Sequence, residues 1–330
     1  MREARDPLRG FADRLREDEP GCLRPAPRLF ALGRSCERRP QVTRPDLSDR
    51  LAIFGSAVLF STGGVAIKWV AFGAWQVAGL RALLAAVAVC TLVPGPVVMR
   101  HRAVILTGLA QGSAMLLFVL ANKSTTAANA IFLQCAAPLY IPLLASRVLG
   151  ERATKRDLAA MAGIAAGLVC FFVGSQEPSA TAPQPRLGDL LAIASGVAWA
   201  CTVVGLRYLA RGGVMAAGAA KGALLWGNLF VAAVALPIAF PLPASGGTDW
   251  GVLVFLGVAQ VALAYRLLVR AVARVPALEA SLLALFEPVL NPVWAFALLG
   301  EKPSSWALVG AAILATVTIA RAVAGSRGQV

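Results

Sequence analysis

Long apolar runs alternate with short polar connections from residue 51 to residue 323. The runs at 103–122, 158–176 and 222–248, for example, contain no charged side chain. A helix needs about 17–25 mostly apolar residues to cross the hydrocarbon core of a membrane. The pattern therefore predicts ten transmembrane helices, at about 51–70, 74–93, 103–121, 126–146, 157–174, 188–208, 217–240, 250–270, 277–299 and 304–323.

The segment 121–151 is repeated at 271–301 without a gap. The matching positions are Pro138 and Pro288, Pro142 and Pro292, Gly150 and Gly300, and Glu151 and Glu301. Alanine and leucine matches arise easily in an apolar chain, but two prolines four residues apart followed by Leu-Gly-Glu do not. A duplicated membrane unit with proline-interrupted helices at corresponding places is typical of secondary transporters.

Basic residues gather on one side of the predicted topology. Beyond residue 50 there are 19 Lys and Arg, of which 14 lie on the side of the N-terminus, four on the opposite side and one, Arg81, within a span. The excess of basic residues marks the cytoplasmic side, so we expect both termini to be cytoplasmic. The fold class predicted is an all-α integral membrane protein, with ten transmembrane helices in two inverted five-helix repeats. The repeats are expected at 50–174 and 188–323, joined by a linker at 175–187 and followed by a tail at 324–330.

Residues 1–49 differ from the rest of the chain. The first fifty residues hold 12 Arg and 9 Asp or Glu, with several prolines and little hydrophobic periodicity. We interpret 1–49 as a disordered basic cytoplasmic tail. Two alternatives stay open: a nucleic-acid-binding or lipid-binding arm, or a translation start nearer the first span.

Composition supports a bilayer location and excludes several kinds of chemistry. The chain is 58% hydrophobic and 15% charged, with a mean hydropathy of +0.71. It contains no G-x-x-x-x-G-K-[ST], H-E-x-x-H or G-x-S-x-G motif, and His101 is its only histidine. No two of its six cysteines form a C-x-x-C pair. We therefore expect no metal, no cofactor and no enzyme activity, and the spread of the net charge of +14 argues against a nucleic-acid partner.

A series of short motifs, in a fixed order along the chain, indicates a family resemblance. They are 60–68 FSTGGVAIK, 75–81 WQVAGLR, 125–134 TTAANAIFLQ, 149–151 LGE, 188–192 GDLLA, 196–200 GVAWA, 276–283 PALEASLL, 287–288 EP and 299–301 LGE. In this order the chain resembles the drug/metabolite transporter superfamily, in its EamA-like ten-span group, over about 51–323. The resemblance implies export or uptake of small metabolites by alternating access, and it leaves the substrate open.

Glu287 is the sharpest candidate for a functional residue, because it lies within a span beside Pro288. Proline removes a backbone donor and favours a bend, and intramembrane carboxylates usually line a pathway. We interpret Glu287 as a substrate or proton-coupling site, or alternatively as a structural carboxylate. Asn291 shares its helix face. Arg81 could hold a substrate carboxylate or pair with Glu287 or Glu279.

Five further polar residues occupy matching spans and are candidates for substrate binding. Asn129 and Gln134 lie in the fourth span, and Gln111, Gln260 and Tyr265 lie in the third and eighth. In an inverted repeat the fourth and ninth spans are expected to meet near the midplane. The alternative for Asn129 and Gln134 is interhelical hydrogen bonding, and the alternative for the other three is packing.

Residues at the ends of the spans are interpreted as structural. Charge on Glu151 and Glu301 is expected to favour the following helix through its dipole. Lys68 and Arg207 are expected to extend to the membrane interface, and the Gly-x-x-x-Gly pairs at 108–112 and 163–167 permit close helix contact. Such small-residue faces leave room for a homodimer.

The resulting functional hypothesis is a carrier in the inner membrane. We expect efflux of a small metabolite, an amino acid or a related compound, with proton exchange at Glu287. Two alternatives use the same fold: a membrane-embedded ligand sensor, and a membrane enzyme or lipid flippase. A hydrophobic lateral opening with an arginine at its mouth would favour the flippase.

Overall fold

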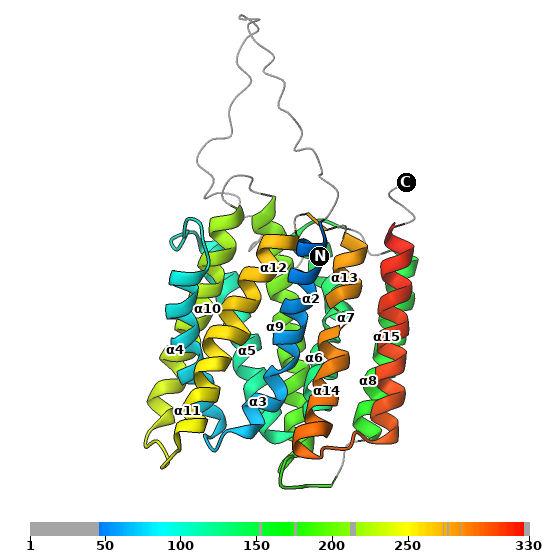
Figure 1. Ribbon diagram of the computed structural model, residues 1–330. Helices are drawn as coiled ribbons and strands as arrows, with labels where there is room; N and C mark the ends of the chain where they lie inside the picture. Colours follow the sequence, from blue (N-terminus) through cyan, green and yellow to red (C-terminus); the bar gives the residue numbers. More distant parts are fainter. Residues whose placement is uncertain are drawn as a thin grey trace, which may run out of the picture.

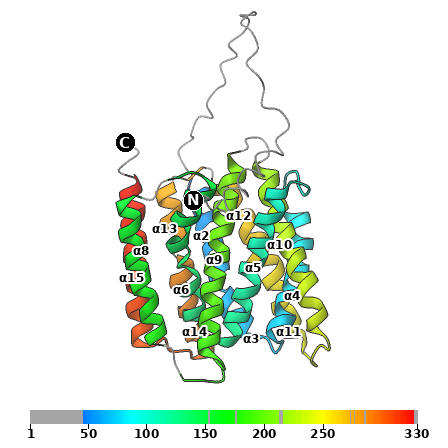
Figure 2. The same cartoon turned by 180° about the vertical axis from the view of Figure 1, so that it is seen from behind.

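The structure is a computed structural model, and it describes residues 46–151, 154–174, 177–211, 216–272, 274–275, 277–284 and 286–326. Its regular elements in these ranges are helices, and a single isolated β-bridge joins Ser179 and Ala182 within the predicted linker. Most of the predicted tail 1–49 lies outside the described residues, and so does the end of the predicted tail 324–330. The bundle is drawn in Figure 1, and Figure 2 shows it from behind.

The first half of the chain forms α2 (Leu47–Ser61), α3 (Gly63–Trp69), α4 (Ala74–Leu92), α5 (Arg102–Ser124), α6 (Ala127–Gln134), α7 (Ala137–Val148) and α8 (Lys155–Val173). The second half forms α9 (Pro185–Ala210), α10 (Ala216–Ala239), α11 (Gly247–Val254), the π-helix η2 (Phe255–Leu263), α12 (Ala264–Val272), α13 (Ala277–Ala284), α14 (Phe286–Leu299) and α15 (Ser305–Ser326).

Each of the ten predicted spans coincides with helix. In the described part of the chain, nine helical segments are long and apolar enough to cross a membrane, and a shorter apolar stretch covers Ser305–Ala320. The prediction of an all-helical membrane protein is confirmed. The predicted number of ten spans is reached if the shorter apolar stretch is counted with the nine longer segments.

The fourth span is broken into two helices, and the ninth span is described as two helices on either side of residue 285. α6 ends at Gln134 and α7 begins at Ala137, while α13 ends at Ala284 and α14 begins at Phe286. Pro138 lies in the first turn of α7, where the missing N–H costs no intrahelical hydrogen bond. Pro138 therefore fixes the position of the break in the fourth span, and its counterpart Pro288 is the third described residue of α14.

The two repeats interleave rather than sit side by side. α5 packs on α9 and α10, α4 packs on α10 and η2, and α2 packs on α12 and α14. The last helices of the two repeats, α8 and α15, pack together at one edge of the bundle (Figures 1 and 2). Every helix around the centre thus contacts helices of the other repeat.

The predicted small-residue pairs serve contacts within the chain. A Cβ on Gly112 would lie 2.5 Å from the carbonyl oxygen of Gly227, and one on Gly167 would lie 3.2 Å from that of Gly310. Glycine is required at such close approaches of two backbones. These faces are covered by α10 and α15, and no homodimer is indicated by them.

The bundle has two ends, which we name by their glutamates. At the Glu301 end, α3, α5 and α14 finish and α6 and α9 begin; at the Glu151 end, α7 and α9 finish and α2 begins. Gly150 and Gly300 have φ of +69° and +68°. The amides of Glu151 and Glu301 donate to carbonyls six residues earlier, at 3.3 Å in both. The sequence repeat is thus also a repeat of backbone conformation.

Candidate functional site

A mainly apolar cavity with several polar side chains in its lining lies between the two repeats. Its volume is about 90 Å³, below the roughly 300–1,000 Å³ common for drug-sized ligands. Six of the eight predicted binding residues line it: Arg81, Gln111, Gln134, Gln260, Tyr265 and Glu287. Its remaining wall is mainly apolar and includes Phe60, Met115, Phe118 and Trp199. Helices from both repeats therefore bring sparse polar groups to one small central space.

Arg81 is buried on α4 and reaches across to the other repeat. Its Nη2 donates to Oε1 of Gln260 at 2.9 Å and contacts the sulfur of Met115 at 3.6 Å. Its Nη1 is buried and has no hydrogen-bond partner among the described residues. The alternative in which Arg81 pairs with Glu287 or Glu279 is not seen among the described residues, where the amide of Gln260 holds the guanidinium and Glu279 pairs with Arg50 at 2.7 Å.

Glu287 is the second residue of α14, and it lines the cavity. It forms no ion pair within the described ranges. Because an intramembrane carboxylate without a fixed cation is costly in its charged form, Glu287 is suited to exchange a proton or to bind a cationic group.

The glutamines of the cavity differ in how they are held. Gln134 donates from Nε2 to the hydroxyl of Ser195 at 2.7 Å, and that hydroxyl donates to the carbonyl of Ala114 at 2.8 Å. Gln111, by contrast, has a buried Oε1 for which the described residues supply no partner. Gln134 therefore links α6 to α9 and also lines the cavity. The Oε1 of Gln111 remains available as a hydrogen-bond acceptor within the described residues.

Gln260 sits on the π-helix η2, although its counterpart Gln111 sits on a regular α-helix. π-Helical turns inside α-helices are rare and occur often at functional sites. Here the wider turn accompanies the residue that holds Arg81. Nothing in the repeated Ala-Gln pattern distinguishes the two spans, so the π-helical turn could not be predicted from the sequence.

Two predicted residues lie outside the cavity. Asn129 donates from Nδ2 to both carboxylate oxygens of Asp189, at 3.1 and 3.2 Å, so the interhelical alternative describes its contacts. Asn291 is fully buried against Gly64, where an added Cβ would lie 2.7 Å from either polar atom of the amide. Neither polar atom of Asn291 has a partner in the described part of the chain.

A buried ion pair closes the Glu301 end of the bundle. Lys68 Nζ lies 2.7 Å from Oε1 of Glu301 and also donates to the carbonyls of Thr125 and Thr181. Oε2 of Glu301 accepts from the amide of Ala127 at 2.8 Å, at the start of α6. Both predictions were wrong in detail: Lys68 does not extend to the interface, and Glu301 serves α6 of the other repeat rather than the helix that follows it.

The ion pair is part of a larger polar cluster at the Glu301 end. Asp189 accepts from the hydroxyl of Thr125 at 2.7 Å as well as from Asn129. Asp189 is fully buried. Sequence reasoning missed it as a site residue, although a carboxylate at the second residue of the predicted span 188–208 was a usable signal.

The Glu151 end carries a comparable but open arrangement. Oε1 of Glu151 lies 2.8 Å from Nη2 of Arg207 and 2.7 Å from Nη2 of Arg211. Arg50 and Glu279 are also paired there, and all these side chains are partly exposed. The cavity extends toward this end, because Leu206 on α9 and Ala220 on α10 line it near the ends of their helices.

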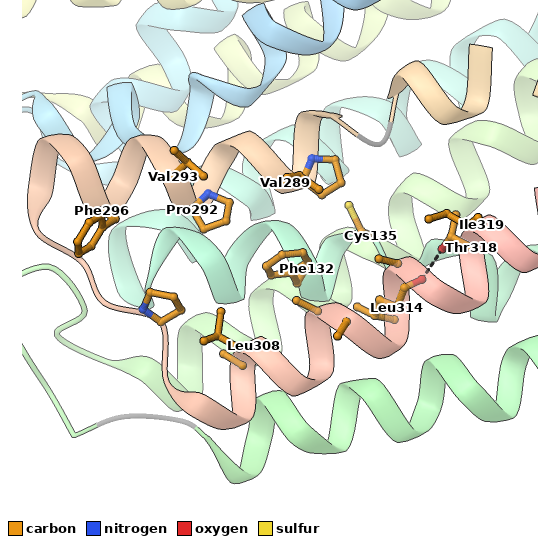
Figure 3. Close-up of a pocket in the computed structure, with 16 residues that line it drawn as sticks. Phe132, Cys135, Val289, Pro292, Val293, Phe296, Leu308, Leu314, Thr318 and Ile319 are labelled. Atoms are coloured by element: carbon orange, nitrogen blue, oxygen red, sulfur yellow. Dashed lines mark hydrogen bonds between the residues drawn. The ribbon is translucent and has the colours of Figure 1, made fainter. Parts of the chain in front are cut away.

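An apolar groove of about 540 Å³ runs along α14 and α15, with α6 as its floor. Figure 3 shows Pro292, Val293 and Phe296 of α14 opposite Leu308 and Leu314 of α15. The hydroxyl of Thr318 donates to the carbonyl of Leu314 within its own helix, at 2.7 Å. The groove therefore offers hydrocarbon contact, and its described lining residues include no charged side chain.

No group of three His, Cys, Asp or Glu side chains that could hold a metal occurs in the described residues. Two repeats of membrane helices around a central cavity define the general architecture of secondary transporters. Consistent with that class, the model of the EamA-like transporter family matches residues 50–173 and 186–320, and the chain belongs to this family of membrane transporters of small molecules.

The comparison with solved structures supports the fold and says nothing further about function. A solved structure titled "Crystal structure of protein" aligns with a TM-score of 0.56 at 21% identity, over 87% of this chain and 100% of that chain. No curated protein matches the sequence. The family and the cavity therefore carry the functional argument.

Proposed function

We propose that this protein is a secondary active transporter that exports a small metabolite, an amino acid or a related compound, by alternating access. The observation that supports it most is the cavity, in which Arg81 and Glu287 come together from opposite repeats in the middle of their spans. A cation and a carboxylate in one small space match a zwitterion, whose carboxylate and ammonium groups need opposite partners.

Arg81 is the proposed partner of the substrate carboxylate. Its Nη2 is already used by Gln260, and its buried Nη1 is free of partners in the described residues. A buried donor without a partner costs about 1–3 kcal/mol, and a bound carboxylate would remove that cost. The free Oε1 of Gln111 would accept a hydrogen bond from the substrate amine or from another donor.

Glu287 is the proposed site of proton coupling. It has no fixed cation among the described residues, so either a proton or a substrate ammonium group can neutralise it. Competition between the two for one carboxylate would exchange substrate for protons. The distribution of Lys and Arg further supports an inner-membrane orientation with the Glu151 end in the cytoplasm.

The test is transport by the purified protein in liposomes, with a panel of labelled amino acids and related metabolites. Arg81→Gln should lower the affinity for a carboxylate-bearing substrate at least about tenfold, the effect of losing one charge-assisted hydrogen bond. The matched control is Arg186→Gln, since Arg186 is exposed at the start of α9. Equal affinity of Arg81→Gln and wild type would refute the assignment of Arg81.

The apolar groove of Figure 3 favours lipid transport as a second candidate function. It is a lateral hydrophobic opening, as a flippase requires, but no arginine is among its described lining residues. A headgroup would therefore lack a cation along this path. Movement of fluorescent phospholipid between leaflets in the same liposomes would support this candidate, and its absence alongside amino acid flux would exclude it.

A further inference from the structure

The ion pairs at the two ends of the bundle are equivalent by the sequence repeat. Glu151 and Glu301 occupy the same position of the two repeats, and Lys68 and Arg207 each end the first span of a repeat. In the structure Lys68 pairs with Glu301, and Arg207 pairs with Glu151. Each ion pair thus joins a cation from one repeat to the carboxylate of the other.

A second set of contacts follows the same rule. Asn129 and Glu279 are equivalent in the repeat, and Asp189 precedes Arg207 by as many residues as Arg50 precedes Lys68. Asn129 bonds Asp189 at the Glu301 end, and Glu279 pairs with Arg50 at the Glu151 end. We call Lys68, Glu301, Asn129 and Asp189 the Glu301 latch, and Arg207, Arg211, Glu151, Arg50 and Glu279 the Glu151 latch.

The two latches differ in burial. The side chains of Lys68 and Glu301 are 4% and 5% exposed, whereas those of Arg207 and Glu151 are 49% and 35% exposed. Arg50 and Glu279 are similarly open, at 46% and 34%. The same pair of positions is therefore sealed at one end of the molecule and solvent-accessible at the other.

This asymmetry agrees with the position of the cavity, which extends toward the Glu151 end and not through the buried cluster at the Glu301 end. Breaking a buried ion pair leaves an uncompensated charge and is strongly unfavourable. Exposed pairs of the same kind contribute little. The closed Glu301 end is thus held by its latch, and the Glu151 end is held weakly.

We propose that the two latches are the gates of the transport cycle and exchange roles, so that the Glu151 latch becomes buried when the Glu301 latch opens. This inference rests on the proposed transport function. It assigns gating to nine side chains that do not line the substrate cavity. An equilibrium between two such states shifts when one of them loses a stabilising contact.

The experiment measures distances across both ends by electron paramagnetic resonance of spin-labelled full-length chain, with all six native cysteines replaced by alanine. One label pair replaces Trp69 and Arg186 at the Glu301 end, and another replaces Arg147 and Arg270 at the Glu151 end. All four side chains are exposed, and each pair joins the two repeats. The measurement needs no substrate.

Neutralising the Glu301 latch with Glu301→Gln should raise the population of longer distances at that end at least about tenfold. The same change should shorten the distances at the Glu151 end. Neutralising Arg207 and Arg211 together should have the opposite effect at both ends, and Arg156→Gln, at an exposed position on α8, should have none. If Glu301→Gln does not fold, Asp189→Asn tests the same latch.

Unchanged distances in these variants, or a shift in the same direction at both ends, would overturn the proposal. The outcome of this test can be told apart from the outcome of the transport test. Reciprocal shifts without flux of any compound in liposomes would leave the gates standing and remove the transport assignment. Flux in wild type with no reciprocal shifts would remove the gates alone.

Discussion

Gly227 on α10 is the position where one added methyl group tests the packing around the cavity. A Cβ there would lie 1.8 Å from Oε1 of Gln111, 2.8 Å from the carbonyl oxygen of Gly108 and 2.9 Å from the amide nitrogen of Gly112. The Gln111 side chain can rotate away, but the backbone of α5 cannot. Gly227→Ala therefore forces α10 and α5 apart and turns the Gln111 amide out of its place in the cavity.

The cost can be estimated from these distances. Ordinary contact begins at 3.4 Å, so the two backbones must separate by several tenths of an ångström. Overpacking of this kind costs about 1–3 kcal/mol, and in a helix alanine recovers up to about 1 kcal/mol relative to glycine. The matched control is Gly251→Ala on α11, where an added Cβ meets nothing within 4 Å. This variant should therefore show only the stabilisation that alanine brings to a helix.

The assay is thermal unfolding in detergent, followed by tryptophan fluorescence. The midpoint of Gly227→Ala should lie below that of Gly251→Ala by about 2–4 °C for each kcal/mol lost. Equal midpoints for the two variants would refute the close contact of α5 with α10, and with it the placement of Gln111.

Three further predictions concern stability and use the same unfolding assay. Lys68→Met should lower the free energy of unfolding by about 3–5 kcal/mol, because the buried carboxylate of Glu301 loses its cationic partner. Arg50→Gln should lower it by at most about 1 kcal/mol, because the Arg50–Glu279 pair is exposed. Similar losses in the two variants would contradict the difference in burial between the two pairs. Gly150→Ala and Gly300→Ala should each cost about 1–2 kcal/mol, since alanine is strained at φ of +69° and +68°, and wild-type stability in either would contradict this turn geometry. Asn291→Ala should be neutral or stabilising because it removes a buried amide without described partners, and a loss above about 1 kcal/mol would show that this amide is bonded.

Much of the fold could be predicted because a membrane helix is determined by a continuous stretch of apolar residues. Apolar length predicted the spans, and Pro138 marked the position where the fourth span breaks. The interleaving of the repeats could not be predicted, since it depends on contacts such as Gly112 with Gly227 between helices far apart in the chain. The π-helical turn at Gln260 is equally a product of tertiary packing.

The candidate site could be predicted in part for a related reason. Polar residues in the middle of apolar spans are rare and face the interior, so Arg81 and Glu287 were found from position alone. Residues near span ends were misjudged because sequence does not show which repeat they meet. Lys68 occupies a position typical of an interfacial lysine, and only the approach of Glu301 buries it.

The proposed exchange of substrate for protons depends on the carboxylate of Glu287. The measurement is substrate flux in liposomes with and without an imposed pH gradient, for wild type, Glu287→Gln and the control Glu177→Gln, whose carboxylate is exposed outside the cavity. We expect gradient-driven flux in wild type and in the control. In folded Glu287→Gln we expect substrate flux that is independent of the gradient, or no flux. Gradient-driven flux that persists in Glu287→Gln, or wild-type flux that ignores the gradient, would contradict it.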